Sequence, residues 1–167
     1  QLQCLESLGL LQGLPADARA IEKHPRWNVP GDSGFAAHSP ADVHQRARAY
    51  LEINCAHCHT QDGKPSDFNL FLDSFRAVDE WYGICKPGPS FGGLTYDIVP
   101  GHAGKSILHF RDISTESVVR MPQLARSIVN NEASELISAW INVALPALDA
   151  GNEAAVLNEE ACTSAPN

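Results

Sequence analysis

The sequence predicts an all-α fold, and three observations support this prediction. Apolar residues recur at helical spacing in residues 43–51 and again in residues 136–144. A helix start signal precedes the first of these stretches. No alternation of apolar and polar residues, the pattern of a half-buried strand, is evident anywhere in the 167 residues. This length is enough for one domain with its own core.

The first 39 residues are expected to form an N-terminal extension of the main domain. Residues 1–14 are rich in leucine and end at Pro15, which suits a short helix packed on the body. Prolines and glycines interrupt residues 16–39, and apolar periodicity fades there, so an ordered loop across the surface is expected.

The main domain is expected to span residues 40–150 and to open with a helix. Ser39 supplies a capping hydroxyl, Pro40 suits the first helical position, and Asp42 is favoured near the positive end of the helix dipole. One apolar stripe then follows and leads directly into residues 55–59; it consists of Val43, Ala47, Tyr50 and Leu51.

The rest of the domain is predicted as long loops with two further helices. Glycine and proline punctuate residues 61–101, which are read as loops carrying an apolar and aromatic cluster around a core. A short helix is expected over residues 103–112. The last helix should begin near residue 130 and end at Pro146. Residues 151–167 have the small polar composition of a tail or linker. The loop cluster consists of Phe68, Leu70, Phe71, Leu72, Phe75, Trp81 and Tyr82.

Charge and hydropathy exclude some classes of partner. The chain carries 20 acidic residues against 12 Lys and Arg, a formal charge of −8, which argues against nucleic acid. No apolar run approaches the roughly 20 residues of a membrane-spanning helix. A redox partner with a basic or metal-centred patch would gain in association rate from this charge.

The pentapeptide Cys55-Ala56-His57-Cys58-His59 is the attachment sequence for c-type haem. Two thiols three positions apart can each add to a haem vinyl group, and the adjacent histidine can then reach the iron. Two other interpretations are a redox dithiol and half of a zinc site, whose tetrahedron His57 or His59 and Cys85 or His102 would complete. The first lacks its α/β setting, and the second lacks another ligand pair, so one covalent haem c is predicted.

The second axial ligand of the iron decides between electron transfer and catalysis. Met121 is the only methionine, and it lies before Pro122 in a non-helical stretch where a loop could place its sulfur over the porphyrin. His102 and His109 are the alternatives, which would give two histidine ligands. More remote candidates are His24, His38 and His44.

The remaining cysteines suggest an exported protein with one disulfide. Covalent haem attachment takes place in an oxidising compartment, which predicts a periplasmic or extracellular location. The chain opens without a secretory leader, so we expect a processed chain or a module of something longer. Cys4 paired with Cys162 is the expected bridge, and Cys4 paired with Cys85 is its rival.

With these assignments, residues 40–147 resemble the small class I cytochromes c. The resemblance implies thioether bonds at Cys55 and Cys58, and His59 and Met121 on the iron. It also implies a crossing of the first and last helices at two aromatic residues, Tyr50 and Trp140.

Further segments are similar to exported bacterial cytochromes that recur as electron-transfer modules of large secreted proteins, some with carbohydrate-binding domains. These segments are Ile98-Val99-Pro100-Gly101, Ser106-Ile107-Leu108, Arg120-Met121-Pro122 and residues 136–141. Relatives with two haem motifs exist, whereas this chain has one.

The sequence therefore predicts a single-electron carrier with His/Met ligation and no catalytic residues of its own. Its acceptor is expected to be a copper monooxygenase or oxidase, with a link to polysaccharide degradation. The side chains expected to bond the haem propionates are Arg120, Arg126, Trp81 and Tyr96. A peroxidase-like enzyme with an acid or base such as His102 or His109 is one alternative, and a haem-based sensor is another.

Overall fold

The computed structural model describes residues 1–21, 23–29, 34–63, 69–124, 126–149 and 162. Phe68 and the predicted tail at residues 151–167, apart from Cys162, lie outside the described residues. The helices are α1 (Leu2–Ser7), α2 (Pro40–Leu51), α3 (Ile107–Ile113), α4 (Asn131–Ala139) and α5 (Leu145–Asp149). The strands are β1 (Pro87–Phe91) and β2 (Leu94–Tyr96). Short 3-10 turns lie at Ala18–Ala20, Phe35–Ala37, Glu80–Tyr82 and Ala103–Lys105, and π-helical turns at Glu52–Ala56 and Trp140–Ala144.

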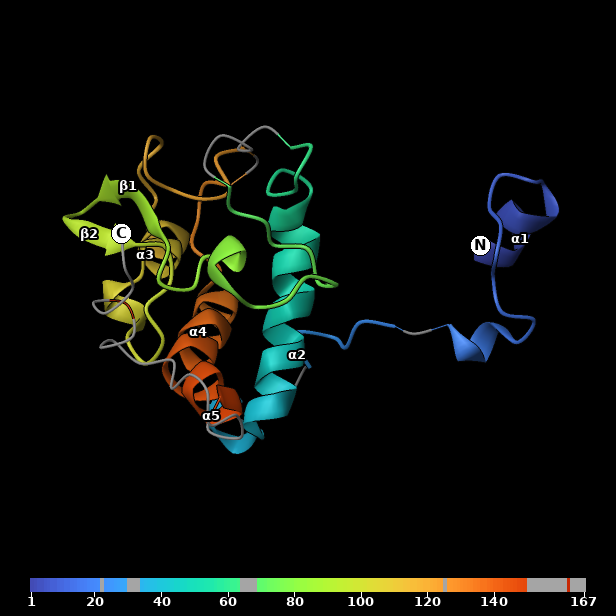
Figure 1. The fold of residues 1–167 in the computed structure, drawn as a ribbon, viewed down its shortest axis with the longest axis horizontal. Coiled ribbons are helices and arrows are strands. Elements are labelled where there is room, and N and C mark those ends of the chain that lie inside the picture. Colours follow the sequence, from blue (N-terminus) through green and yellow to red (C-terminus); the bar gives the residue numbers. More distant parts are fainter. Residues whose placement is uncertain (22, 30–33, 64–68, 125, 150–161, 163–167) are drawn as a thin grey trace.

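The core lies where α2 packs on α4 and on the π-helical turn that follows it (Figure 1). The start of α2 is as predicted, because the Ser39 hydroxyl accepts a hydrogen bond from the Asp42 N–H at 3.2 Å. Both predicted apolar stripes face this core and are buried. Their members are Val43, Ala47, Tyr50 and Leu51 on one side and Leu136, Ile137, Trp140, Ile141 and Ala144 on the other.

The prediction of an all-α fold is wrong, because β1 and β2 form a two-stranded antiparallel sheet in the region read as loops. Phe91 pairs with Leu94, which leaves Gly92 and Gly93 as a two-residue turn. Their φ values of +60° and +78° suit glycine and the turn that joins such strands. The strand was missed because the prolines of β1 argue against a strand. Both strands of a two-stranded sheet are edges, however, where proline is tolerated.

The last helix also differs from the prediction, because it does not end at Pro146. The chain continues from α4 through the π-helical turn into α5, and Pro146 is the second residue of α5. A proline is tolerated there since the first N–H groups of a helical segment need no partner within it. The helix predicted over residues 103–112 is likewise divided at Ser106, into a 3-10 turn and α3.

The N-terminal extension contacts the body through its second half. We expected the first helix to pack on the body, but α1 has no buried residue and stands apart in Figure 1. Trp27 packs edge-on against Tyr50 of α2, with 5.3 Å between ring centroids. The Asn28 amide donates a hydrogen bond to Glu132 of α4. The domain boundaries themselves stay a prediction.

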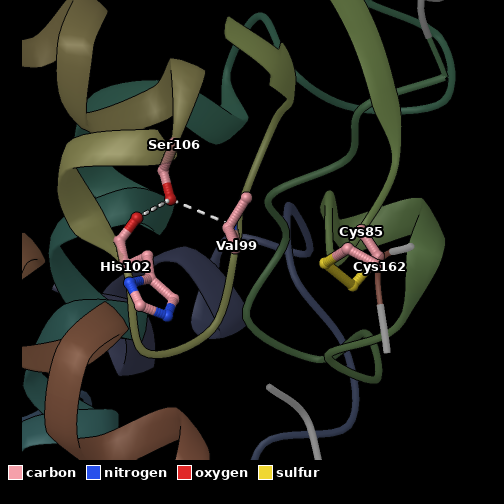
Figure 2. The surroundings of a disulfide bond; sticks show 5 residues. All are labelled: Cys85, Val99, His102, Ser106 and Cys162. Carbon is pink, nitrogen blue, oxygen red and sulfur yellow. Dashed lines mark hydrogen bonds between the residues drawn. A yellow bond between two sulfur atoms is a disulfide. The ribbon is translucent and has the colours of Figure 1, made fainter. Parts of the chain in front are cut away.

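One disulfide joins Cys85 to Cys162 (Figure 2), so both expected pairings of Cys4 are wrong. Cys4 is a free, exposed thiol on α1, which places it away from the other cysteines. Figure 2 also shows Ser106, whose hydroxyl accepts from the Val99 N–H at 2.9 Å and donates to the His102 carbonyl at 3.0 Å. These bonds fix the turn that leads into α3.

Candidate haem site

The Cys-x-x-Cys-His segment begins inside a π-helical turn that continues α2. The N–H groups of Cys58 and His59 both donate to the Cys55 carbonyl, at 3.1 and 2.8 Å, so the pentapeptide closes into one turn. Cys55 is half-buried and Cys58 is exposed, and both are free thiols. The segment therefore presents two unbridged sulfur atoms at the carboxyl end of α2, as thioether attachment needs.

His59 is oriented by a backbone carbonyl. Its Nδ1 lies 3.2 Å from the Leu70 carbonyl oxygen, which can only accept, so Nδ1 carries the proton and Nε2 is the nitrogen left to bind a metal. Burial lowers the pKa of His59, which the hydrogen bond to Leu70 opposes. The neutral ring is the form that binds iron. The Leu72 N–H in turn donates to the His59 carbonyl at 2.8 Å.

Gly63 closes the turn after the motif against the backbone of Cys58. A Cβ at position 63 would lie 1.8 Å from the Cys58 carbonyl oxygen, far inside contact distance. The Gly63 N–H donates to the Thr60 carbonyl at 2.8 Å. Only glycine therefore fits here without moving the peptide that precedes His59.

The surroundings of Cys55 argue against the redox dithiol. Burial raises the pKa of the Cys55 thiol to about 12, and the charges of Asp112 and Cys58 act in the same direction while Arg126 opposes them. A reactive dithiol needs a lowered thiol pKa. The surroundings of Cys55 therefore shift its pKa in the opposite direction from that of a redox dithiol.

The zinc interpretation also lacks support. Cys85, one of its candidate ligands, is in the disulfide. Within the described part of the chain, no three His, Cys, Asp or Glu side chains are grouped so that they could hold a metal ion.

Met121 belongs to the segment between α3 and α4. This segment runs at the end of the molecule where α2 finishes and the haem motif begins (Figure 1). Its N–H donates to the Arg111 carbonyl at 3.0 Å, and its carbonyl accepts from Arg126 Nη1. The side chain is half-buried. The backbone of the predicted ligand is therefore held from both sides.

Arg126 ties this segment to the end of α3. Its Nη2 donates to the carbonyls of Asp112 and Ser114, the latter at 3.2 Å, and its Nε donates to the Ile128 carbonyl at 3.1 Å. Its charge also lowers the pKa of Cys55, against the larger effect of burial, because the two groups are close. Arg126 thus fixes the Met121 segment against the end of α3.

The other residues predicted to bond propionates lie in three places. Arg120 donates to the carbonyls of Thr115 and Gln123 at 3.2 and 3.5 Å, and its buried Nε has no partner among the described residues. Trp81 is 48 % exposed and stacks on Phe71, with ring centroids 6.1 Å apart. Tyr96 is half-buried on β2. Their role toward a propionate stays a prediction.

The alternative histidine ligands are spread over the molecule. His109 is half-buried on α3 and borders a cavity of about 470 Å³ between α3 and α4. Burial lowers its pKa, and Asp112 opposes this. His102 is exposed, His24 and His44 border a different cavity, and His38 contacts Asp42 at 2.8 Å.

Apolar side chains at the motif end suit a porphyrin. Ile53, in the turn that carries Cys55, is 63 % exposed, and Leu124 and Ile128, on either side of Arg126, are 83 % and 77 % exposed. Both the turn that carries Cys55 and the segment that carries Met121 thus expose large apolar side chains. Such side chains suit a flat apolar macrocycle tethered at Cys55 and Cys58, and the residues present fit a haem.

Sequence reasoning missed the groups that orient the site. Leu70 acts through its backbone carbonyl, for which a sequence carries no signal. α3 places the charge of Asp112 near Cys55 and the carbonyl of Arg111 beside the Met121 N–H. Both effects depend on how the chain folds.

Comparisons with protein families, curated proteins and solved structures found no match to this chain. The described residues include no helix of the length and apolar character needed to cross a membrane.

Proposed function

We propose that this chain is a monohaem c-type cytochrome that carries single electrons. The observation that carries the proposal is the motif turn: two free thiols and a histidine whose Nδ1 is held by Leu70, which leaves Nε2 for iron. A bound haem c supplies reversible Fe(II)/Fe(III) cycling. Cys55 and Cys58 would tether it, and His59 and Met121 would hold its iron.

The residues around the iron would set its reduction potential. Thioether sulfur is a neutral donor, and together with apolar surroundings it favours the lower charge of Fe(II), which gives a positive reduction potential. With His59 and Met121 both on the iron, no position would be left for a substrate. Arg120, Arg126, Trp81 and Tyr96 are proposed to bond the propionates.

The tether is tested by extraction. Acidified organic solvent should remove no porphyrin from the denatured protein, because thioether bonds survive it. The double variant Cys55→Ser/Cys58→Ser should release its haem under the same conditions. Free haem in the extract of the unaltered protein contradicts the proposal.

The sixth ligand is tested by spectroscopy and potentiometry. Met121→Ala should abolish the weak long-wavelength sulfur-to-iron band of the ferric protein and lower its potential, since a ligand that favours Fe(II) is lost. His102→Ala and His109→Ala are matched controls and should keep the band. An unchanged spectrum in Met121→Ala would assign the position to another residue.

The partner is proposed to be a separate exported redox protein, a copper oxidase or a copper monooxygenase acting on polysaccharide, in the periplasm or outside the cell. Because the chain carries −8, transfer to a basic or metal-centred partner should slow as salt rises. Stopped-flow mixing of the ferrous protein with such enzymes measures this rate. Slow oxidation by all of them, with rapid turnover of peroxide by the protein alone, would favour the peroxidase-like enzyme.

A further inference from the structure

A second cavity, of about 360 Å³, is lined by none of the residues of the haem motif. It is enclosed by residues 23–25 of the N-terminal extension, by α2, and by Ser74 and Phe75 of the loop that follows the motif. The extension is tied to that loop by a contact of 3.1 Å between His24 Nε2 and the Ser74 hydroxyl. Its volume falls in the range of about 300–1,000 Å³ that is usual for ligand sites.

The described residues that line this basic cavity bring positive charge and include no carboxylate. Lys23 and Arg48 contribute two formal positive charges, and His24 and His44 add two imidazoles. This is unusual in a chain whose net charge is −8. Two neighbouring carboxylates are already engaged, since Glu52 accepts from the Ser74 N–H at the edge of the cavity and Asp73 pairs with Arg76 at 3.7 Å.

Arg48 is held rigidly without being neutralised. Its side chain is 7 % exposed, and its guanidinium lies 4.5 Å over the Tyr82 ring. Its Nη2 donates to the backbone carbonyls of Asp73, Ser74 and Arg76. Among the described residues it has no carboxylate partner.

His44 adds a fixed donor. Its Nδ1 accepts a hydrogen bond from the indole N–H of Trp140 at 3.1 Å, so the proton of the neutral ring must be on Nε2. Nε2–H is then the polar group that His44 has left for a ligand. The donors of the cavity thus come from Lys23, Arg48 and His44, on two separate segments.

We propose that the basic cavity binds a small phosphate-type oxyanion, either inorganic phosphate or the phosphate group of a monoester. A phosphate dianion suits two cations better than a carboxylate does, because a carboxylate carries only one negative charge. Arg48 cannot present a free two-nitrogen fork to a planar carboxylate, because Nη2 is engaged and Nε is buried without access. This inference is independent of the haem.

Isothermal titration of the purified full chain with inorganic phosphate, and separately with glycerol phosphate, tests it at constant ionic strength set with sodium chloride. We expect saturable binding at one site per chain for at least one of them, and the tighter one identifies the source of the phosphate. Lys23→Gln should weaken this binding about tenfold, the factor expected for one lost charge-assisted hydrogen bond.

Lys105→Gln is the matched control, because it removes the same charge outside the basic cavity and should leave the affinity unchanged. Lys23 is exposed, so its replacement should not impair folding, whereas Arg48→Gln carries that risk and is not needed for the decision. Absence of saturable binding by both ligands, or equal weakening in Lys23→Gln and Lys105→Gln, would overturn the proposal.

Discussion

Acid should destabilise this protein through His44, which is neutral in the folded state. Burial lowers the pKa of His44 from 6.5 to about 4, and the nearby charge of Arg48 acts in the same direction. The same ring accepts the hydrogen bond of the fully buried Trp140. A proton on Nδ1 would break that bond, and the positively charged Lys23 and Arg48 line the same cavity as the ring.

Stability depends on pH here because the pKa of His44 differs between the folded and the unfolded chain. Below pH 6.5 the unfolded chain binds a proton at His44 that the folded chain refuses until about pH 4, so stability falls as pH falls through this window. Between pH 7 and pH 5 the free energy of unfolding would fall by about 2 kcal/mol if the whole pKa shift of His44 applied. Because the ring is only half-buried, solvent screening reduces the expected loss to about 1 kcal/mol.

Urea unfolding at pH 7 and pH 5 measures this loss in the unaltered protein and in His44→Asn. The Asn amide oxygen can replace Nδ1 as the acceptor for Trp140, but it does not titrate. Asp97 and Asp112, whose pKa values burial raises, titrate in both proteins and cancel in the comparison. The reasoning is refuted if His44→Asn loses as much stability between the two pH values as the unaltered protein does.

Three substitutions test other parts of the fold. Gly63→Ala should cost about 1–3 kcal/mol of unfolding free energy, since its Cβ meets the Cys58 carbonyl; an unchanged thermal midpoint would contradict this. Cys162→Ser removes a disulfide that spans 77 residues and should lower the free energy of unfolding in urea by about 4 kcal/mol. A reducing agent should then have no further effect on the urea midpoint of this variant. Arg126→Gln, which removes donors to backbone carbonyls, should cost about 2 kcal/mol by the same assay, and a loss below 0.5 kcal/mol would show that these bonds add little.

Much of the core could be predicted because helical periodicity reports burial directly. Val43 and Leu51 on α2, and Leu136 and Ile141 in the last helix, are buried as their spacing indicates. Ser39 could be predicted as the cap of α2 because its hydroxyl bonds the N–H only three residues further on. Such a local pattern is visible in the sequence.

The failures concern contacts between distant segments. The hairpin was missed because Pro87 and Pro89 argue against a strand, although the pair Gly92-Gly93 is a usable turn signal. The partner of Cys162 depends on where the loops lie, and no spacing rule fixes it. At the site, the motif itself could be found from sequence, but the Leu70 carbonyl that orients His59 could not.

The bond between Cys85 and Cys162 also decides what a protease can remove. It makes a covalent ring of the chain from just before β1 to beyond α5, and that ring includes Met121, while Cys55 and His59 lie outside it. A single cut anywhere within the ring leaves one molecule, because the two pieces stay joined through sulfur. For a protein proposed to work outside the cytoplasm, a nicked loop would thus still keep the Met121 segment attached to the part of the chain that holds the haem.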